Sequence, residues 1–283
     1  MLIDLHTHST FSDGLLTVEQ LVRQAKKKGV KMMALTDHDT ISGWVLFKKL
    51  CGKYGIMGVR GLEMSTDLNG LELHILGYEP IKNHRPLAEH LKQQQNKRIE
   101  RAKVVLTKLE QLGLNFKPEV VRHLLQQPTV GKPQLGRAVL HEQHNRLLLK
   151  KLFNFEGSLS DFINNFLDKP GQVGYVRKKR INSVSAIRLI RACGGKAVLA
   201  HPDLELPNVA KASRVIKILA RAGLWGMEYP HYQSSRAKYL LPLAKKYNLA
   251  ITYGSDTHDG KKMGISVNEI ESKKIYEGIF GHC

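Results

Sequence analysis

The sequence predicts an α/β protein built on a parallel sheet closed as a barrel, with a helical segment inserted into it. Two observations predict this fold class. Short apolar strand candidates alternate with amphipathic helix candidates near both ends of the chain, whereas the middle of the chain is almost entirely helical in pattern. Repeated βα units favour parallel strands, and 283 residues are enough for one barrel domain.

The N-terminal part supplies the first alternating elements. Residues 2–5 form a strand candidate, and residues 17–28 form a helix candidate because apolar side chains recur there at helical spacing. Gly29 follows this helix at a position where glycine commonly ends one. Further along, the sequence predicts strands over 31–35, 56–61 and 71–78, and a helix over 42–53.

The alternation returns in the C-terminal part. The sequence predicts strands over 196–200, 226–229 and 250–253, and helices over 183–193, 208–222 and 234–247. Between the two parts lies a segment rich in Lys, Arg and Gln without strand candidates. We therefore expect a barrel formed by residues 1–83 and 175–283, and a helical, basic subdomain over 84–174 that covers the substrate.

The composition is that of an ordinary globular protein with an excess of basic residues, which a folded enzyme would fit. The chain is 42% hydrophobic and 24% charged, with a formal net charge of +19, which excludes collagen-like and disordered classes. Such a charge attracts polyanions, so phosphorylated substrates or RNA are favoured. Charge alone does not separate these partners from an ordinary basic surface.

Cysteine usage and hydropathy indicate a cytoplasmic protein. Cys51, Cys193 and Cys283 are isolated from one another, which predicts neither a disulfide framework nor a cysteine-bound zinc ion. Residues 1–10 do not have the pattern of an export signal, and no apolar stretch approaches the roughly 20 residues that span a bilayer. We expect no membrane association and infer no obligate protein partner.

Polar side chains of metal-binding type follow the predicted strands. In a parallel α/β protein, these strand ends meet at one face of the sheet. His6 and His8 alternate along an extended segment, so both can point to the same side. The full set of candidate ligands is His6, His8, Asp13, His38, Glu63, His74, His201, Asp256 and His258.

Six imidazoles and three carboxylates suit manganese, zinc or iron better than calcium or copper. A single histidine at a strand end is more often structural than a ligand. Nine such residues, in order on a βα framework, are much harder to explain by structure alone. The sequence therefore predicts a metal centre, although it does not determine the metal.

These motifs resemble the polymerase and histidinol phosphatase (PHP) family. The residues that carry the resemblance are His6-x-His8, Asp13, Thr36-Asp37-His38-Asp39, Glu63, His74, Ala200-His201-Pro202 and Ser255-Asp256-x-His258. The nearest branch contains metal-dependent phosphoesterases, including nucleoside 3',5'-bisphosphate phosphatases and the exoribonuclease RNase AM. The resemblance extends over most of the chain and implies a distorted (β/α)7, TIM-like barrel.

The resemblance also implies a cluster of two or three divalent metal ions. One ion would be bound by His6, His8, Glu63 and Asp256, a second by Glu63, His74 and His201, and a third by Asp13, His38 and His258. Asp4 or Asp37 would either orient ligand imidazoles or cap a loop. In such a cluster, metal-activated hydroxide attacks phosphorus. The sequence contains no G-x-S-x-G segment and no complete Walker loop.

The predicted substrate contacts depart from the family pattern. An Arg-x-His element of the relatives is replaced by Lys132-Pro133-Gln134, and Asp203-Leu204-Glu205 stands where relatives tend to have Gly-Arg-Tyr. Lysine cannot form the bidentate contact that arginine offers a phosphate. The candidate substrate-binding residues are Lys132, Gln134, Arg98, Arg101 and Arg137, together with Arg177.

The sequence leaves three functions open. The first is hydrolysis of a nucleotide phosphate monoester, such as the 3'-phosphate of a nucleoside 3',5'-bisphosphate. The second is a 5'-to-3' exoribonuclease acting on short 5'-phosphorylated RNA, for which the +19 charge supplies long-range attraction. The third is a regulatory protein that binds metal without turnover.

Overall fold

The computed structural model describes residues 1–79, 83–127, 130–229 and 238–281. It divides into two compact units. The first unit comprises Met1–Leu91 and Arg180–Cys283, and the second comprises Lys92–Lys179. Cys283 and the first part of the helix predicted over 234–247 lie outside the described residues. In the part of the chain that is described, no helix is long and apolar enough to cross a membrane.

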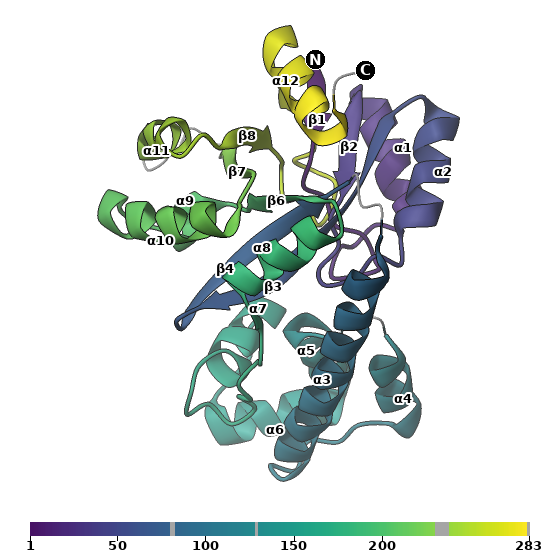
Figure 1. Ribbon diagram of the computed structural model, residues 1–283. Coiled ribbons are helices and arrows are strands. Elements are labelled where there is room, and N and C mark those ends of the chain that lie inside the picture. The colour runs from purple at the N-terminus through teal and green to yellow at the C-terminus, as the bar shows by residue number, and fades with distance from the viewer. Residues whose placement is uncertain (80–82, 128–129, 230–237, 282–283) are drawn as a thin grey trace. The chain divides into compact units, whose positions relative to one another are not determined.

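The first unit is built around one mixed sheet of nine strands (Figure 1). The order of its main path is β8-β7-β6-β4-β3-β2-β1-β9, and β5 pairs with β3. The strands are β1 (Leu2–Asp4), β2 (Met32–Leu35), β3 (Met57–Leu68), β4 (Leu71–Tyr78), β5 (Ile181–Asn182), β6 (Lys196–Leu199), β7 (Gly226–Tyr229), β8 (Ala250–Tyr253) and β9 (Ile265–Ser266).

The two end regions of the sheet approach one another and nearly close a barrel. The backbone N–H of Leu5, just after β1, donates to the carbonyl of Tyr253 in β8 at 3.0 Å. Thr7 and Thr257 continue this contact as an isolated parallel bridge. The α/β class and the barrel-shaped sheet predicted from the sequence are therefore confirmed.

The strand directions differ in part from the parallel arrangement that the sequence suggested. β4 pairs antiparallel with both β3 and β6, whereas β1, β2 and β3 are parallel. The reason is a tight hairpin between β3 and β4, in which Asn69 and Gly70 both have positive φ. Asn-Gly favours this turn because its backbone twist matches that of the flanking strands.

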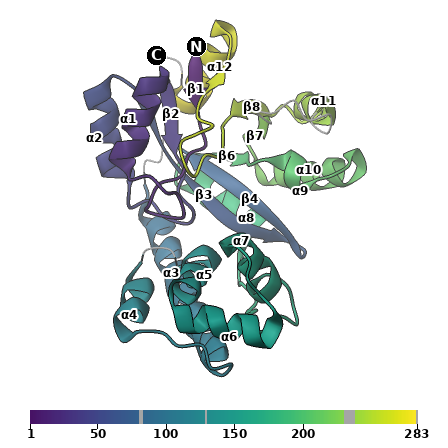
Figure 2. The same cartoon turned by 180° about the vertical axis from the view of Figure 1, so that it is seen from behind.

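Helices cover the outer face of the sheet (Figures 1 and 2). Thr17 caps α1 through a capping box with Gln20, and Gly29 ends this helix in the left-handed conformation, which glycine adopts without a Cβ clash. The helices of the first unit are α1 (Val18–Lys28), α2 (Trp44–Tyr54), α8 (Ser183–Ala192), α9 (Pro202–Glu205), α10 (Val209–Ala222), α11 (Leu240–Lys246) and α12 (Glu269–Phe280).

The alternation of side chains along β3 and β4 carries polar groups into the barrel. Val59 in β3 and Leu76 and Tyr78 in β4 belong to one buried apolar cluster. Because successive strand residues point to opposite faces, Glu63 lies on the same face as Val59, and His74 on the same face as Leu76. The interior is therefore apolar at one end and lined by candidate ligands at the other.

The second unit is helical in its described residues and has its own apolar core, which includes Leu109, Val139 and Phe162. The long helix α3 (Arg85–Glu110) begins in the first unit and ends in the second. The remaining helices are α4 (Pro118–Gln126), α5 (Lys132–His141), α6 (Gln143–Phe153), α7 (Leu159–Phe162) and the π-helix η1 (Ile163–Leu167).

Candidate metal centre

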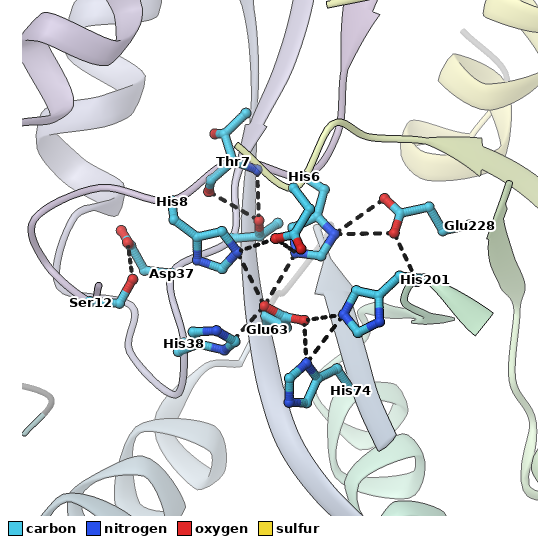
Figure 3. A network of polar contacts seen from close by, with 12 residues as sticks. His6, Thr7, His8, Ser12, Asp37, His38, Glu63, His74, His201 and Glu228 are labelled. Atoms are coloured by element: carbon cyan, nitrogen blue, oxygen red, sulfur yellow. Dashed lines mark hydrogen bonds and ion pairs between the residues drawn. The ribbon is translucent and has the colours of Figure 1, made fainter. Parts of the chain in front are cut away.

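The nine predicted ligands come together in the first unit, around the carboxylate of Glu63 in β3. The imidazoles that contact this carboxylate are drawn in Figure 3 and belong to His6, His8, His38, His74 and His201. Oε2 of Glu63 lies 3.2 Å from Nε2 of both His6 and His8. Oε1 lies 2.9 Å from Nδ1 of His74 and 3.2 Å from Nε2 of His201. Both carboxylate oxygens of Glu63 therefore face candidate metal ligands.

The first group of candidate ligands is His6, His8, Glu63 and Asp256, whose ligand atoms lie within 4.8 Å of one another. Oδ1 of Asp256 is 3.3 Å from Nε2 of His6 and 3.1 Å from Nε2 of His8. This set is the one expected for the first ion.

The second group combines His8, Asp13, His38 and His258. Nε2 of His258 is 3.3 Å from Oδ1 of Asp13, while its Nδ1 faces the carbonyl of Asp256 at 3.0 Å. An Nδ1–H that donates to a carbonyl leaves Nε2 available as a ligand. The family resemblance implied Asp13, His38 and His258 for one ion, and the structure places His8 beside them.

The third group contains His38, Glu63 and His74. His201, which the resemblance assigned to this ion in place of His38, is also close, because its Nε2 lies 3.2 Å from both Nδ1 of His74 and Oε1 of Glu63. Either His38 or His201 is therefore close enough to Glu63 and His74 to complete this group of ligands.

The donor atoms fit divalent metal ions. Several side-chain atoms in this cluster are buried and lack a hydrogen-bond partner, although carboxylates or imidazoles stand close by. Buried polar atoms are costly unless a hydrogen-bond partner, a water or a cation satisfies them, and the mixture of nitrogen and oxygen donors suits zinc, manganese or iron. The atoms are Nε2 of His6, both ring nitrogens of His8, Oδ1 of Asp13, Nδ1 of His38, Oε2 of Glu63 and Nδ1 of His201.

Burial and close charges shift the ionisation of the cluster. Burial disfavours the protonated form of His8, but contacts with Asp256 and Glu63 outweigh this and raise the pKa of His8 to about 10. Burial lowers the pKa of His38 to about 3. Burial alone would raise the pKa of Glu63, but His38 and other imidazoles hold it well below its usual range. The carboxylates are therefore ionised, and protons on imidazoles are what a metal ion must displace.

Asp4 and Asp37 accept hydrogen bonds from loop residues that neighbour the candidate ligands, and Asp4 also accepts from the backbone N–H of His6 at 3.3 Å. Asp4 accepts hydrogen bonds from the backbone N–H and hydroxyl of Ser255 and from the N–H of Gly264. Asp37 accepts from the hydroxyls of Ser9 and Ser12. Of the two roles considered for these residues, the loop contact is the one that the structure shows.

Backbone strain is concentrated at the centre. Asp39, His201 and Asp256 have positive φ angles of 49°, 25° and 51°, a region that side chains other than glycine enter at a cost. Asp39 is held by bonds between its N–H and the carbonyl of Glu63 and between its side chain and the N–H of Ser65. These two bonds therefore hold the turn at Asp39 in place.

Sequence reasoning missed Glu228, the buried acid in β7 that contacts two of the predicted ligands. Both of its carboxylate oxygens lie 3.2 Å from Nδ1 of His6, and Oε2 accepts a 2.9 Å hydrogen bond from the N–H of His201. A charged residue in an otherwise uncharged four-residue strand was the available signal, because a buried carboxylate needs partners.

A second missed contact reaches His74. Glu72 pairs with Arg180, and its other oxygen lies 3.8 Å from Nε2 of His74. The guanidinium of Arg180 therefore lies beside Glu72, which in turn approaches the candidate ligand His74.

The predicted substrate-binding residues Lys132, Gln134, Arg98, Arg101 and Arg137 all belong to the second unit. Nζ of Lys132 forms a 2.5 Å ion pair with Asp168. The side chain of Gln134 accepts from the N–H of Gly131 and so caps α5. Arg137 is exposed. The roles of these five residues toward a substrate stay a prediction.

Fold and site together define an α/β barrel protein with a centre of histidine and carboxylate donors for metal ions. The model of the PHP domain family matches residues 4–186. The chain belongs to the PHP domain family.

Known proteins resemble the chain over nearly its whole length. The 5'-3' exoribonuclease Rnm of Escherichia coli (strain K12) is 31% identical over 262 residues, which cover 91% of this chain and 85% of the relative. The 3',5'-nucleoside bisphosphate phosphatase of Chromobacterium violaceum is 28% identical over 274 residues, covering 95% and 91%. A solved structure described as an amidohydrolase from the same organism, with bound sulfate, is 25% identical with a TM-score of 0.79 and covers 98% of this chain and 97% of its own.

Proposed function

We propose that this protein is a metal-dependent phosphoesterase that hydrolyses the phosphate monoester of a nucleotide, such as the 3'-phosphate of a nucleoside 3',5'-bisphosphate. One observation carries the proposal: the Glu63 carboxylate stands among five imidazoles, and further carboxylates complete groups that can each hold an ion. Such clusters are typical of enzymes that transfer phosphoryl groups to water.

The first ion would be held by His6, His8, Glu63 and Asp256, and the others by the two remaining groups, with manganese, zinc or iron as candidates. When bound, the ions supply an activated water and neutralise charge on the phosphoryl oxygens. The protein's part is to fix the donors before the substrate arrives. Glu63 does so centrally, because it is fully buried and both of its oxygens face imidazoles.

Three serine hydroxyls near the centre and the Cys51 thiol are poorly suited to act as nucleophiles. The hydroxyls of Ser9 and Ser12 donate to Asp37, and that of Ser255 donates to Asp4. Burial raises the pKa of the Cys51 thiol to about 12, so it is not a thiolate near neutral pH. Attack by water is therefore the reaction that the site favours.

A second candidate function is removal of nucleotides from the 5' end of short 5'-phosphorylated RNA. The basic composition of the second unit favours it, since Lys92–Lys179 contains 17 Lys and Arg residues but 7 Asp and Glu residues. Clustered positive charge attracts a polyanion by releasing its counterions. The Escherichia coli relative is named for activity of this kind.

A comparison of substrates distinguishes the two candidate functions. The protein is loaded with Mn²⁺ and given a nucleoside 3',5'-bisphosphate, a nucleoside monophosphate, and 5'-phosphorylated and 5'-hydroxyl RNA trimers, each at the same concentration. A higher kcat/KM for the bisphosphate supports the monoesterase. Preference for the 5'-phosphorylated trimer, with nucleotides released one at a time, supports the exoribonuclease. Activity on none of these substrates contradicts both candidates.

A further inference from the structure

The buried carboxylate of Glu228 links two candidate ligands from different parts of the chain. Glu228 lies in β7 with 3% of its surface exposed. Figure 3 shows it on the far side of the His6 ring from Glu63, and next to His201. It touches the ring of His6 and the backbone of His201, so one side chain contacts both residues without belonging to any of the three ligand groups.

The contact with His6 determines which ring nitrogen is free. Nδ1 of His6 lies 3.2 Å from each oxygen of Glu228, and Nε2 faces Glu63 and Asp256. A carboxylate accepts hydrogen bonds and cannot donate them when ionised. Nδ1 therefore carries the proton in a neutral ring, and the lone pair of Nε2 points to the metal position.

The contact with His201 holds an unfavourable backbone turn. His201 has φ of 25° and precedes Pro202, and a residue before proline strongly prefers extended backbone. Its N–H donates to Oε2 of Glu228 at 2.9 Å. The bond places the imidazole beside Glu63 and His74, because ring position follows from the backbone at this turn.

The chain leaves space for these contacts at Gly254. A Cβ atom at this position would lie 2.4 Å from Oε1 of Glu228 and 2.2 Å from Cβ of His6, closer than side-chain atoms pack. Gly254 directly precedes Ser255 and Asp256. Glycine therefore allows the Asp256 loop to pass against the His6 and Glu228 pair.

We propose that Glu228 is a positioning residue. It orients His6 so that Nε2 is the ligand atom, and it holds the backbone turn at His201. One carboxylate thus prepares the ligands of two ion positions. This inference rests on the proposed metal centre. Among the described contacts, none joins Glu228 to Asp13, His38 or His258, so the binding of an ion by these three residues should be affected least.

Glu228→Gln tests the proposal with little change in shape. The amide keeps only one acceptor oxygen, so Nδ1–H of His6 and the N–H of His201 must share it, and the NH₂ group competes with Nδ1–H of His6. The matched control is Glu205→Gln, because Glu205 is also near His201, at 3.8 Å from Nδ1, but is beyond hydrogen-bond distance. Glu228→Asp keeps the charge and shortens the reach, and it serves as the second variant if the glutamine variant does not fold.

Zn²⁺ affinity and stoichiometry are measured by competition with a chromophoric chelator, alongside circular dichroism of the metal-free proteins. We expect Glu228→Gln and Glu228→Asp to weaken at least one Zn²⁺ site by about 10- to 100-fold while one tight site remains, and Glu205→Gln to bind like the unmodified protein. Spectra of ¹⁵N-histidine-labelled, Zn²⁺-loaded protein, assigned with His6→Asn, should show a shifted and less protected Nδ1–H signal of His6 in Glu228→Gln.

One result would overturn the positioning role of Glu228, and a different result would overturn the metal centre on which that role rests. Unchanged Zn²⁺ affinities together with an unchanged His6 signal in the folded Glu228 variants overturn the positioning role alone. Failure of the unmodified protein to bind Zn²⁺, Mn²⁺ or Fe²⁺ overturns the metal centre on which both the inference and the proposed function rest.

Discussion

Oδ1 of Asp256 lies 3.1 Å from Nε2 of His8, although the two residues come from opposite ends of the sequence. Asp256 also has a positive φ of 51°, which asparagine tolerates better than most residues. The distance and the turn together place a carboxylate oxygen where the imidazoles of the first group converge. Replacing Asp256 with asparagine therefore removes the negative charge of the side chain while keeping its shape and its backbone turn.

Asp256→Asn is expected to lower kcat on the preferred phosphoester at least 100-fold with the fold retained, because one anionic donor is lost from the first group. Asp259→Asn is the matched control, since Asp259 lies in the same segment and pairs with Lys261 at the surface. Near-normal turnover in Asp256→Asn, measured beside this control and with circular dichroism, would remove Asp256 from the centre.

Gly254→Ala is expected to weaken metal binding, because the added Cβ would collide with His6 and Glu228. Gly52→Ala is the control, since a Cβ there meets no atom within 4 Å and alanine favours the helix. Metal content after dialysis against limiting Zn²⁺ measures the effect. Equal metal content in the two variants would contradict the close packing described at Gly254.

Lys132→Ala is expected to raise KM about 10-fold and to leave kcat nearly unchanged, because a phosphate contact of a charged donor contributes roughly 1.5 kcal/mol or more. Lys150→Ala is the control: Lys150 likewise pairs with an acid of the second unit, Glu156, at 2.7 Å, but is not a predicted substrate contact. Steady-state kinetics on the bisphosphate distinguish them. A KM equal to that of Lys150→Ala would exclude Lys132 from substrate binding.

Metal binding is expected to release protons at pH 7. The contacts of His8 with Asp256 and Glu63 raise its pKa to about 10, so in the metal-free protein this imidazole carries a proton that a metal ion must displace. The affinity of the protein for a metal ion should therefore increase with pH up to about 10, the pKa of His8. The same shift stabilises the metal-free fold below its ordinary pKa of 6.5, and that stability is lost as pH rises through about 10.

Calorimetric titration with Zn²⁺ in two buffers of different ionisation enthalpy measures this release directly. If the binding heats differ between the two buffers as expected for uptake of released protons by the buffer, the result agrees with proton release on metal binding. Heats that do not depend on the buffer would show that the histidine ligands are already neutral.

The sequence was sufficient for the barrel class and for the residues that gather at the centre, because both follow from short-range patterns. Glu63 and His74 end up on the interior face through simple alternation along β3 and β4. The antiparallel course of β4 follows from the Asn69-Gly70 turn, a local signal that the alternating βα pattern obscured.

Glu228 could not be assigned from sequence for a different reason. Its partners are a ring nitrogen of His6 and the N–H of His201, and no spacing rule relates β7 to either residue. Likewise, the loop contacts of Asp4 and Asp37 depend on how distant segments pack. Ligand types are visible in the sequence, whereas the residues that orient them become visible only in three dimensions.

Metal-dependent release of phosphate tests the central claim most directly. Protein stripped by a chelator, dialysed free of it and then titrated with Mn²⁺ or Zn²⁺ is assayed on a nucleoside 3',5'-bisphosphate and on 5'-phosphorylated RNA. The account predicts no release from stripped protein and a return of activity as the ions bind. Undiminished hydrolysis by protein shown to be free of metal would contradict it.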